Sequence, residues 1–175
     1  MKEIQLTQEL VALVDDEDFK WLSQWKWHAG LTHRATRFCA VRIGTKEDGD
    51  NWKKTLPMHR ELLKCSKEQQ CDHIDRNPLN NQKYNLRLCT GQQNSCNRAN
   101  WSQYPFKGLH KATRQTSWTA RIRVDGKLIG LGSYQTQEEA AQRYDAAAVY
   151  LFGEFANLNF PEHKDDYLKQ VKELS

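Results

Sequence analysis

The chain has 175 residues, a formal net charge of +4 and a hydrophobic content of 38%, and its 6 Trp, 6 Tyr and 6 Phe make much of that content aromatic. This length allows one large domain or two small ones. No apolar run approaches the roughly 20 residues that span a bilayer, and the first residues lack the apolar core of a signal peptide. We therefore expect a soluble, cytoplasmic protein without a membrane partner.

Positive charge is concentrated in the middle of the chain. Residues 51–100 carry nine Lys and Arg against four Asp and Glu, whereas residues 1–50 carry seven against nine. This bias favours a polyanionic partner such as DNA, although a solvated basic face would give the same count.

The cysteines favour free thiols. Their number is odd, and no two are arranged as a CxxC pair. Spacings of six and seven residues are wide for a zinc knuckle, so a structural zinc is not expected. Without a secretory signal, a disulfide framework is not expected either. We expect free, mostly buried thiols at Cys39, Cys65, Cys71, Cys89 and Cys96.

Short strands and turns are expected over positions 1–56, together with one helix. The acidic run Asp15–Asp18 lacks the alternating ligands of a calcium loop and is typical of a turn or a helix N-terminus. In chain order the patterns predict an apolar strand at 11–14, helical spacing of aromatic residues at 19–27, a strand at 38–43 and an exposed loop at 44–54.

The next block has the order helix, strand, loop, strand, helix. Pro57 favours a helix start, and Thr90 is a good N-cap residue. The patterns predict a short helix at 58–64, a strand at 71–74, a turn-rich loop at 76–81, a strand at 86–89 and a polar helix at 92–100.

Four residues of this block suit the hydrolysis of a phosphodiester. Asp72 can bind a hard divalent cation, and Asn94 can add a second, neutral oxygen ligand. His73 can take a proton from water near neutral pH, and Asn85, further along the chain, can orient the imidazole. A lone His or Asn is more often structural, but the combination predicts an enzyme that acts on nucleic acid. Three further residues are expected only to cap turns or helices: Asn80, Asn81 and Asn97.

A three-stranded sheet on one helix is predicted after residue 102. Asp125-Gly126 is a strong hairpin signal. Thr136 and Glu139 form a capping box at the start of an Ala-rich helix that Gly153 ends. The strands are expected at 106–110, 117–124 and 127–134.

Residues 58–97 resemble the HNH nucleases, in particular the phage and intron homing endonucleases and the His-Asn-Asn variant of their motif. The resemblance implies a ββα-metal fold with one Mg²⁺ or Mn²⁺ held by Asp72 and Asn94, His73 as general base and Asn85 orienting it. It further implies that two basic residues, His59 and Arg87, reach phosphates. The matching residues are Met58-His59-Arg60, Asp72-His73-Ile74-Asp75, Leu79-Asn80-Asn81, Asn85-Leu86-Arg87, Thr90, Gln93-Asn94 and Asn97.

Residues 103–161 resemble the plant Apetala/ethylene-response-factor DNA-binding domain. The matching residues are Lys107-Gly108-Leu109, Trp118-Thr119-Ala120-Arg121-Ile122, Leu131-Gly132-Ser133-Tyr134, Ala140-Ala141, Tyr144-Asp145-Ala146-Ala147, Gly153 and Asn159-Phe160-Pro161. The resemblance implies a sheet that enters the major groove. Strand alternation places Arg121 and Arg123 on the face opposite Ala120 and Ile122, where they would read guanine or grip phosphate. Other expected DNA contacts are Lys107, His110, Trp118 and Lys127.

Together these observations predict an α+β protein with four segments: a mixed strand and helix leader packing on the nuclease at 1–56, an HNH module at 57–102, the plant-like domain at 103–161 and a charged tail at 162–175. The expected function is a site-specific, metal-dependent DNA endonuclease of homing type that acts as a monomer on double-stranded DNA and nicks it. The alternatives are a DNA-binding regulator on an inactive nuclease fold, a structural zinc or DNA-binding module, and a nuclease that acts on RNA.

Overall fold

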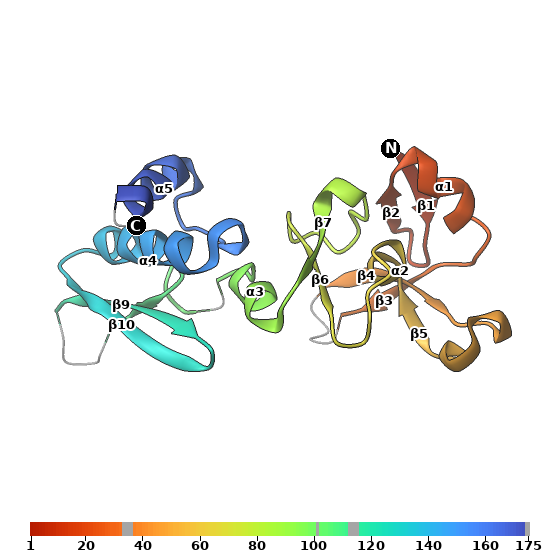
Figure 1. The fold of residues 1–175 in the computed structure, drawn as a ribbon, viewed down its shortest axis with the longest axis horizontal. Helices are drawn as coiled ribbons and strands as arrows, with labels where there is room; N and C mark the ends of the chain where they lie inside the picture. The colour runs from red at the N-terminus through yellow and green to blue at the C-terminus, as the bar shows by residue number, and fades with distance from the viewer. Residues whose placement is uncertain (33–36, 101, 112–115, 174–175) are drawn as a thin grey trace. The chain divides into compact units, whose positions relative to one another are not determined.

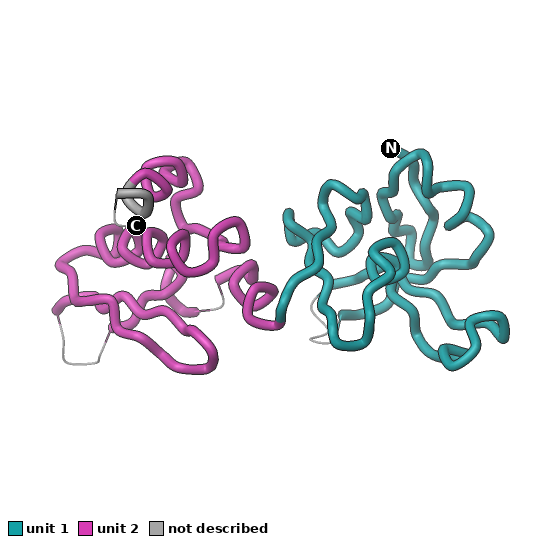
Figure 2. The backbone as a smooth tube through the Cα atoms, viewed as in Figure 1, with its two compact units in different colours: residues 1–90 teal, residues 91–175 magenta. Residues whose placement is uncertain are grey.

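The computed structural model describes residues 1–32, 37–100, 102–111 and 116–173, and the side chains of all of these up to residue 169. The chain divides into two compact units, residues 1–90 and residues 91–175 (Figure 2). Both units combine helices with small antiparallel sheets of two or three strands. The predicted α+β class is therefore confirmed.

The four functional segments expected from the sequence stay predictions, because the two compact units are defined by packing and not by function. Residues 101, 174 and 175 of those segments lie outside the described residues. None of the helices in the described part of the chain combines the length and the apolar character that crossing a bilayer requires.

Three small sheets build the first unit (Figure 1): β1 with β2, β3-β4-β5, and β6 with β7. The elements are β1 (Lys2–Gln5), β2 (Val11–Val14), α1 (Asp16–Leu22), β3 (His28–Leu31), β4 (Phe38–Ile43), the 3-10 helix η1 (Lys46–Asn51), β5 (Thr55–Pro57), α2 (Met58–Leu62), β6 (Gln70–His73), the 3-10 helix η2 (Lys83–Asn85) and β7 (Leu86–Cys89).

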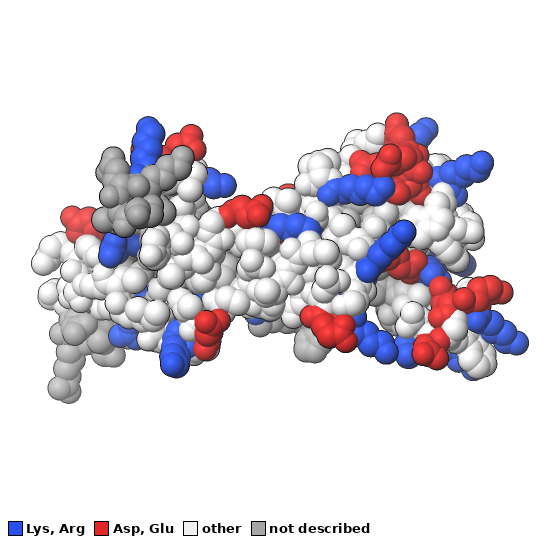
Figure 3. All heavy atoms as spheres, in the orientation of Figure 1, with Lys and Arg blue, Asp and Glu red and all other residues white. Residues whose placement is uncertain are grey.

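Helix α1 is shorter than the aromatic spacing predicts. It ends at Leu22, and Trp27 lies beyond it with its Nε1 donating to the Leu22 carbonyl at 2.9 Å. The acidic run does begin a helix, as expected, and Figure 3 shows its acidic side chains gathered over α1. Lys83 pairs with two of them, Glu17 at 2.6 Å and Asp18 at 3.0 Å.

One core joins the first strands to α2. Alternation along β2 turns Ala12 and Val14 to the same side, and both are fully buried. Met58, the first residue of α2, lies in the same cluster and is also fully buried. The remaining buried members of the cluster are Ile4, Leu22, Trp27 and Ala40.

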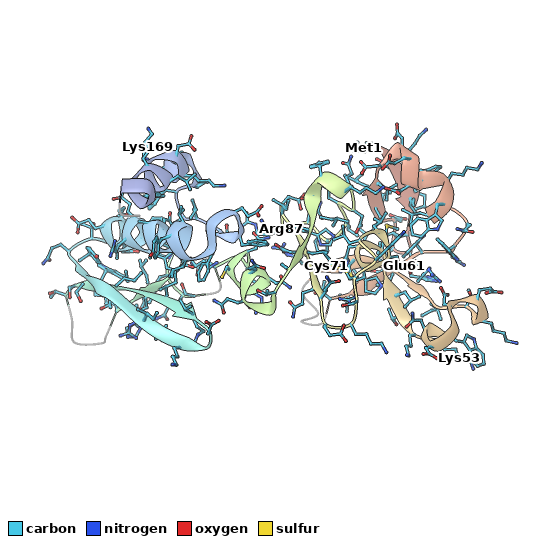
Figure 4. All side chains as sticks on the ribbon, in the orientation of Figure 1. Met1, Lys53, Glu61, Cys71, Arg87 and Lys169 are labelled. Atoms are coloured by element: carbon cyan, nitrogen blue, oxygen red, sulfur yellow. A yellow bond between two sulfur atoms is a disulfide. The ribbon has the colours of Figure 1, made fainter. Side chains whose placement is uncertain are left out.

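Helix α2 is fixed to β4 by a buried arginine. The two terminal nitrogens of Arg42 each donate to a carboxylate oxygen of Asp48 at 2.7 Å, and its Nε donates to Glu61 at 3.1 Å. The guanidinium also stacks over the Trp25 ring, 4.4 Å from its centroid. Glu61 belongs to α2 (Figure 4), so this network sets where α2 places its other side chains.

The expectation of five free thiols is wrong for two of them. Cys65 and Cys71 form a disulfide, whereas Cys39, Cys89 and Cys96 are free and buried. The short connection from α2 to β6 brings the two sulfur atoms together, and sequence spacing alone does not reveal this turn of the chain.

In the second unit, helix α4 covers one face of a three-stranded sheet of order β10-β9-β8 (Figure 1). Buried Ala side chains of α4 let it approach the sheet closely. The elements are α3 (Gly91–Cys96), β8 (Leu109–His110), β9 (Trp118–Val124), β10 (Lys127–Tyr134), α4 (Gln137–Phe152), the 3-10 helices η3 (Gly153–Phe155) and η4 (Pro161–His163), and α5 (Lys164–Glu173).

The capping box and the hairpin turn that the sequence predicts are both present in this unit. Thr136 and Glu139 make the predicted capping box, with the Glu139 amide donating to the Thr136 hydroxyl at 3.2 Å. Asp125 and Gly126 turn the β9–β10 hairpin, both with positive φ. Helix α3 is shorter than the expected 92–100 and ends at Cys96.

A buried carboxylate ties the end of the plant-like region to α4. Asp145 is fully buried and accepts hydrogen bonds from the Asn159 amide at 2.9 Å, the Asn159 side chain at 3.0 Å and the Phe160 amide at 2.8 Å. Burial nevertheless raises the pKa of Asp145 above its ordinary value. This network holds Asn159 and Phe160 against α4.

Candidate active site and DNA-binding sheet

The hairpin of β6 and β7 carries the Asp72-His73 pair. Its antiparallel register sets Asp72 opposite Arg87 and His73 opposite Leu86. Asp72 is 7% exposed, and its Oδ2 accepts from Arg87 Nη2 at 2.9 Å and Nε at 3.1 Å. Arg87, expected to reach phosphates, therefore neutralises the buried carboxylate in this structure, as its place on β7 dictates (Figure 4).

The imidazole of His73 lies against the side-chain amide of Asn81, a residue that was expected from the sequence only to cap a turn or a helix. His73 Nε2 is 3.3 Å from Oδ1 of Asn81. The Asn81 side chain is fully buried, and its Nδ2 donates to the Pro78 carbonyl at 3.5 Å, which turns Oδ1 toward the ring. Because an amide oxygen only accepts, this contact sets the proton on Nε2 and the lone pair on Nδ1.

Burial also favours the neutral form of this histidine. His73 is 9% exposed, and the loss of solvation lowers its pKa below the ordinary value. A neutral ring with its lone pair on Nδ1 is able to accept a proton at neutral pH.

Asn81 owes its position to strand β2. Its backbone amide donates to the Leu13 carbonyl at 2.8 Å, and the Leu13 amide donates to the Leu79 carbonyl at 2.8 Å. Asp15 accepts from the Lys83 amide at 2.8 Å and from the Gln82 side chain at 3.1 Å. The first residues of the chain thus hold the loop that supports His73.

Asn85 organises the same loop from the other side. Its Oδ1 accepts from the Asp75 amide at 2.9 Å, and its Nδ2 donates to the Asp75 carboxylate at 2.9 Å and the Asn80 carbonyl at 2.8 Å. These bonds shape the turn after His73. The expected hold of Asn85 on the imidazole stays a prediction, while the contact that the structure records on the ring comes from Asn81.

His59 meets His73 edge to face. The ring centroids are 4.9 Å apart and the planes are inclined at 69°. His59 Nδ1 is buried without a hydrogen-bond partner, and burial, aided by the charges of His73 and Arg60, lowers the pKa of His59 to about 3. The expected phosphate contact stays a prediction, but the ring that the structure places here is neutral near pH 7.

The metal ligands expected from the sequence lie on different elements. Asp72 lies on β6 in the first unit, and Asn94 lies on α3 in the second. Among the described residues, no three His, Cys, Asp or Glu side chains are grouped so as to hold a metal ion. The expected site has one carboxylate, one amide and water as ligands, so it does not contain three such side chains.

The sheet of the second unit presents basic side chains on the face away from α4. Ala120 and Ile122 are buried toward the helix, so Arg121 and Arg123 lie on the other face. Arg121 is partly buried and pairs with Gly130, while exposed Arg123 pairs with exposed Leu128. Arg123 Nη1 also donates to the Gly126 carbonyl at 2.7 Å.

The other residues expected to contact DNA differ in where the structure places them. Lys127 is exposed at the start of β10, and His110 pairs with Thr119 and shares the outer face. Lys107 donates from Nζ to the Arg98 carbonyl at 3.0 Å, and its contact with DNA stays a prediction.

Trp118, another expected DNA contact, packs against the hydrophobic cluster on the helix side of the sheet. It meets the Tyr104 ring edge to face with centroids 5.1 Å apart, and the Lys111 ammonium lies 4.7 Å from the centroid of the Trp118 ring.

The fold and site define an α+β protein that combines a buried Asp-His hairpin with a basic, sheet-based surface. No family model matches the chain. The chain is 43% identical over 148 residues to an uncharacterized HNH endonuclease of Acanthamoeba polyphaga mimivirus, a match that covers 80% of this chain and 71% of the relative. The chain therefore belongs to the HNH endonuclease family.

Shorter similarities connect the chain to plant transcription factors. It is 47% identical over 60 residues to ethylene-responsive transcription factor ERF010 of Arabidopsis thaliana, which covers 33% of this chain and 32% of the relative. It is 41% identical over 66 residues to dehydration-responsive element-binding protein 2D of the same plant, again 32% of that relative. The chain thus spans about a third of these plant proteins.

Proposed function

We propose that the protein is a site-specific, divalent-metal-dependent DNA endonuclease of homing type that nicks its target with His73 as general base. The observation that carries the proposal is the buried His73, whose Nε2 faces Asn81 Oδ1 at 3.3 Å in a member of the HNH endonuclease family. In this tautomer Nδ1 takes the proton of the attacking water, a step that contributes about 10²- to 10⁴-fold to the rate.

Asp72 is the charged ligand that we propose for Mg²⁺ or Mn²⁺, with Asn94 as the neutral ligand expected from the sequence. The donor set suits a cation that keeps several waters and takes oxygen atoms from the phosphate. The Asp72 carboxylate lies next to His73 on β6 and supplies an oxygen donor of the kind that such a cation prefers, so this residue fits. When bound, the cation would stabilise charge on the phosphate and on the departing oxygen.

The sheet of the second unit is the proposed reader of the DNA sequence. Arg121 and Arg123 lie on its outer face, and a guanidinium binds the major-groove edge of guanine with two hydrogen bonds. A reader separate from the hydrolytic site would give the enzyme its choice of target. With one His73 in each chain, a monomer would cut one strand at a time.

The Asp72–Arg87 ion pair favours a second candidate, a DNA-binding regulator on an inactive nuclease fold. In that case Arg87 would hold the carboxylate permanently and no cation would bind there. The two candidates share the DNA-binding sheet and differ in cleavage.

Nicking of supercoiled plasmid that carries phage or host DNA tests the proposal. Open-circle product is expected with Mg²⁺ or Mn²⁺, and none with EDTA or with His73→Ala. His28→Ala, which removes a histidine from β3 of the same unit, serves as the matched control and should cut normally. Binding without cleavage under all metal conditions would favour the regulator, and cleavage by His73→Ala would refute the assigned base.

A further inference from the structure

A pocket of about 400 Å³ opens beside the turn that follows β6 in the first unit. Its floor is largely apolar and two arginines line it, although neither belongs to the residues assigned above to catalysis or DNA contact. The lining residues are Leu10, Arg37, Phe38, Asp75, Arg76, Asn77, Pro78 and Leu79.

The first notable arginine has an unfavourable backbone conformation. The Arg76 amide donates to the His73 carbonyl at 2.9 Å and closes the turn, and Arg76 has a φ of 64°. This left-handed region favours glycine, because a Cβ crowds the following carbonyl oxygen. Arg76 is exposed and lies three residues after His73, so its guanidinium is available at the pocket next to the candidate base.

The second arginine reaches the same turn from the residue before β4. Exposed Arg37 donates from Nη1 to the Arg76 carbonyl, which places both arginines at one pocket. A guanidinium has five N–H donors, so this bond leaves donors of the Arg37 fork that can bind an anion.

The carboxylate of the pocket is satisfied within the loop. Asp75 accepts from the Asn77 amide at 2.7 Å, from Asn85 Nδ2 at 2.9 Å and from Asn80 Nδ2 at 2.8 Å. These bonds hold its negative charge among loop donors, so the arginines dominate the charge that the pocket offers to a ligand.

We propose that this pocket binds the sugar-phosphate backbone of DNA next to the scissile phosphate. Arg37 and Arg76 bind the phosphates that flank the one at His73, and a deoxyribose packs on the apolar floor that Phe38 and Pro78 provide. The inference rests on the proposed function, because His73 marks where the scissile phosphate lies. It gives the nuclease unit its own grip on the strand, independent of the sheet that reads sequence.

The salt dependence of DNA binding tests this inference without cleavage. The affinity of the full chain for a short DNA duplex would be measured in EDTA over a range of salt concentrations, for wild type, Arg76→Gly, Arg37→Gln and the double variant. Each lost phosphate contact lowers the magnitude of the slope of log binding constant against log salt concentration by about 1. The slope of the double variant should therefore fall by about twice as much as that of either single variant. Arg76→Gly keeps the carbonyl that Arg37 binds, and its melting temperature should equal or exceed that of wild type.

Lys53→Gly is the matched control, because Lys53 is also an exposed basic residue with positive φ, 59°, in the same unit. It should leave the slope unchanged. Unchanged slopes in both arginine variants, an equal loss in Lys53→Gly, or no binding by wild type would each overturn the inference. If the arginine variants show the expected loss of slope but the wild type cuts no DNA in Mg²⁺, the pocket proposal would be supported and only the nuclease proposal would be refuted.

Discussion

At the scale of the residue, His73 is defined by two neighbours that are remote in sequence. Asn81 fixes its tautomer from one side, and His59 packs on its ring from another. Both neighbours are themselves held by residues earlier in the chain, Asn81 through Leu13 and α2 through Arg42. The chemistry of the ring therefore depends on these earlier residues as much as on the hairpin that carries it.

Replacing Asn81 with Ala should slow nicking by about 10- to 100-fold, a part of the roughly 10²- to 10⁴-fold that a well-placed general base contributes. The physical reason is that Nε2 loses its acceptor, so the ring no longer favours the proton on Nε2. Nitrogen NMR of the His73 ring in the metal-free protein should show a mixture of tautomers in the variant and the Nε2–H form in wild type.

Asn77→Ala is the control for this prediction, because Asn77 belongs to the same loop but bonds to other loop residues: its amide donates to Asp75, and its Oδ1 accepts from the Leu79 amide at 3.1 Å. Its ring spectrum should match wild type. An Asn81→Ala protein with the wild-type tautomer and rate would show that Asn81 is a packing residue.

Stability should fall in acid because of His59. Its pKa is about 3 in the folded chain, against 6.5 for the unfolded value. Between these two values the unfolded chain binds a proton that the folded chain does not, so the free energy of unfolding decreases as pH falls through this window, by at most about 1.4 kcal/mol per pH unit. Above pH 6.5 this contribution is fully present.

Urea unfolding at several pH values between 7.5 and 4 measures this dependence. His59→Phe keeps an aromatic ring against His73 but cannot titrate, and it should flatten the slope. A residual slope is expected from His73, whose pKa burial also lowers. Equal slopes in wild type and His59→Phe would mean that His59 is accessible to protons in the folded chain.

At the scale of the element, the packing of α4 against the segment before β8 depends on Gly108. Its φ is 83°, and a Cβ placed there would lie 2.0 Å from the Tyr144 ring of α4. Gly108→Ala should lower the free energy of unfolding by about 2–5 kcal/mol, through backbone strain and overpacking together. Chemical denaturation of the full chain measures it.

Gly126→Ala provides the comparison for that measurement. Gly126 has a similar φ of 79°, but nothing lies within 4 Å of the position that a Cβ would take there. The substitution should cost about 1–2 kcal/mol from strain alone. If both variants lose the same stability, the close approach of Tyr144 contributes nothing.

Elements with local signals were predictable from the sequence, and those fixed by distant contacts were not. The Asp125-Gly126 turn and the Thr136 capping box set β9, β10 and the start of α4 through near neighbours in the chain. Strand β1 and the end of α1 were missed, because their packing depends on distant partners such as Met58.

The same distinction applies to the candidate site. Residue types and spacing marked Asp72 and His73, but Asn81 was expected only to cap a turn. Its contact with the ring depends on Leu13, which lies far from it in the sequence. The ion pair of Asp72 with Arg87 follows from the strand register, which the sequences of two strands of four residues each do not reveal before folding.

At the scale of the whole molecule, the proposed general base and the proposed sequence reader belong to different compact units. His73 and the proposed backbone pocket belong to residues 1–90, and the sheet with Arg121 belongs to residues 91–175. An enzyme divided in this way should lose its choice of site while it keeps its ability to cut. We expect Arg121→Ala combined with Arg123→Ala to have this effect in the full chain.

Sequencing of nick positions over a viral or bacterial genome measures this outcome. Wild type should give a few strong positions, and the double variant should give many weak ones at a similar total rate in excess enzyme, because each lost guanine contact removes about 1–3 kcal/mol of discrimination. Lys169→Ala, an exposed basic residue on α5, controls for loss of positive charge and should keep the wild-type positions. An unchanged map in the double variant would place the reader elsewhere in the chain, and loss of all cutting would show that the sheet also contributes to the hydrolytic step.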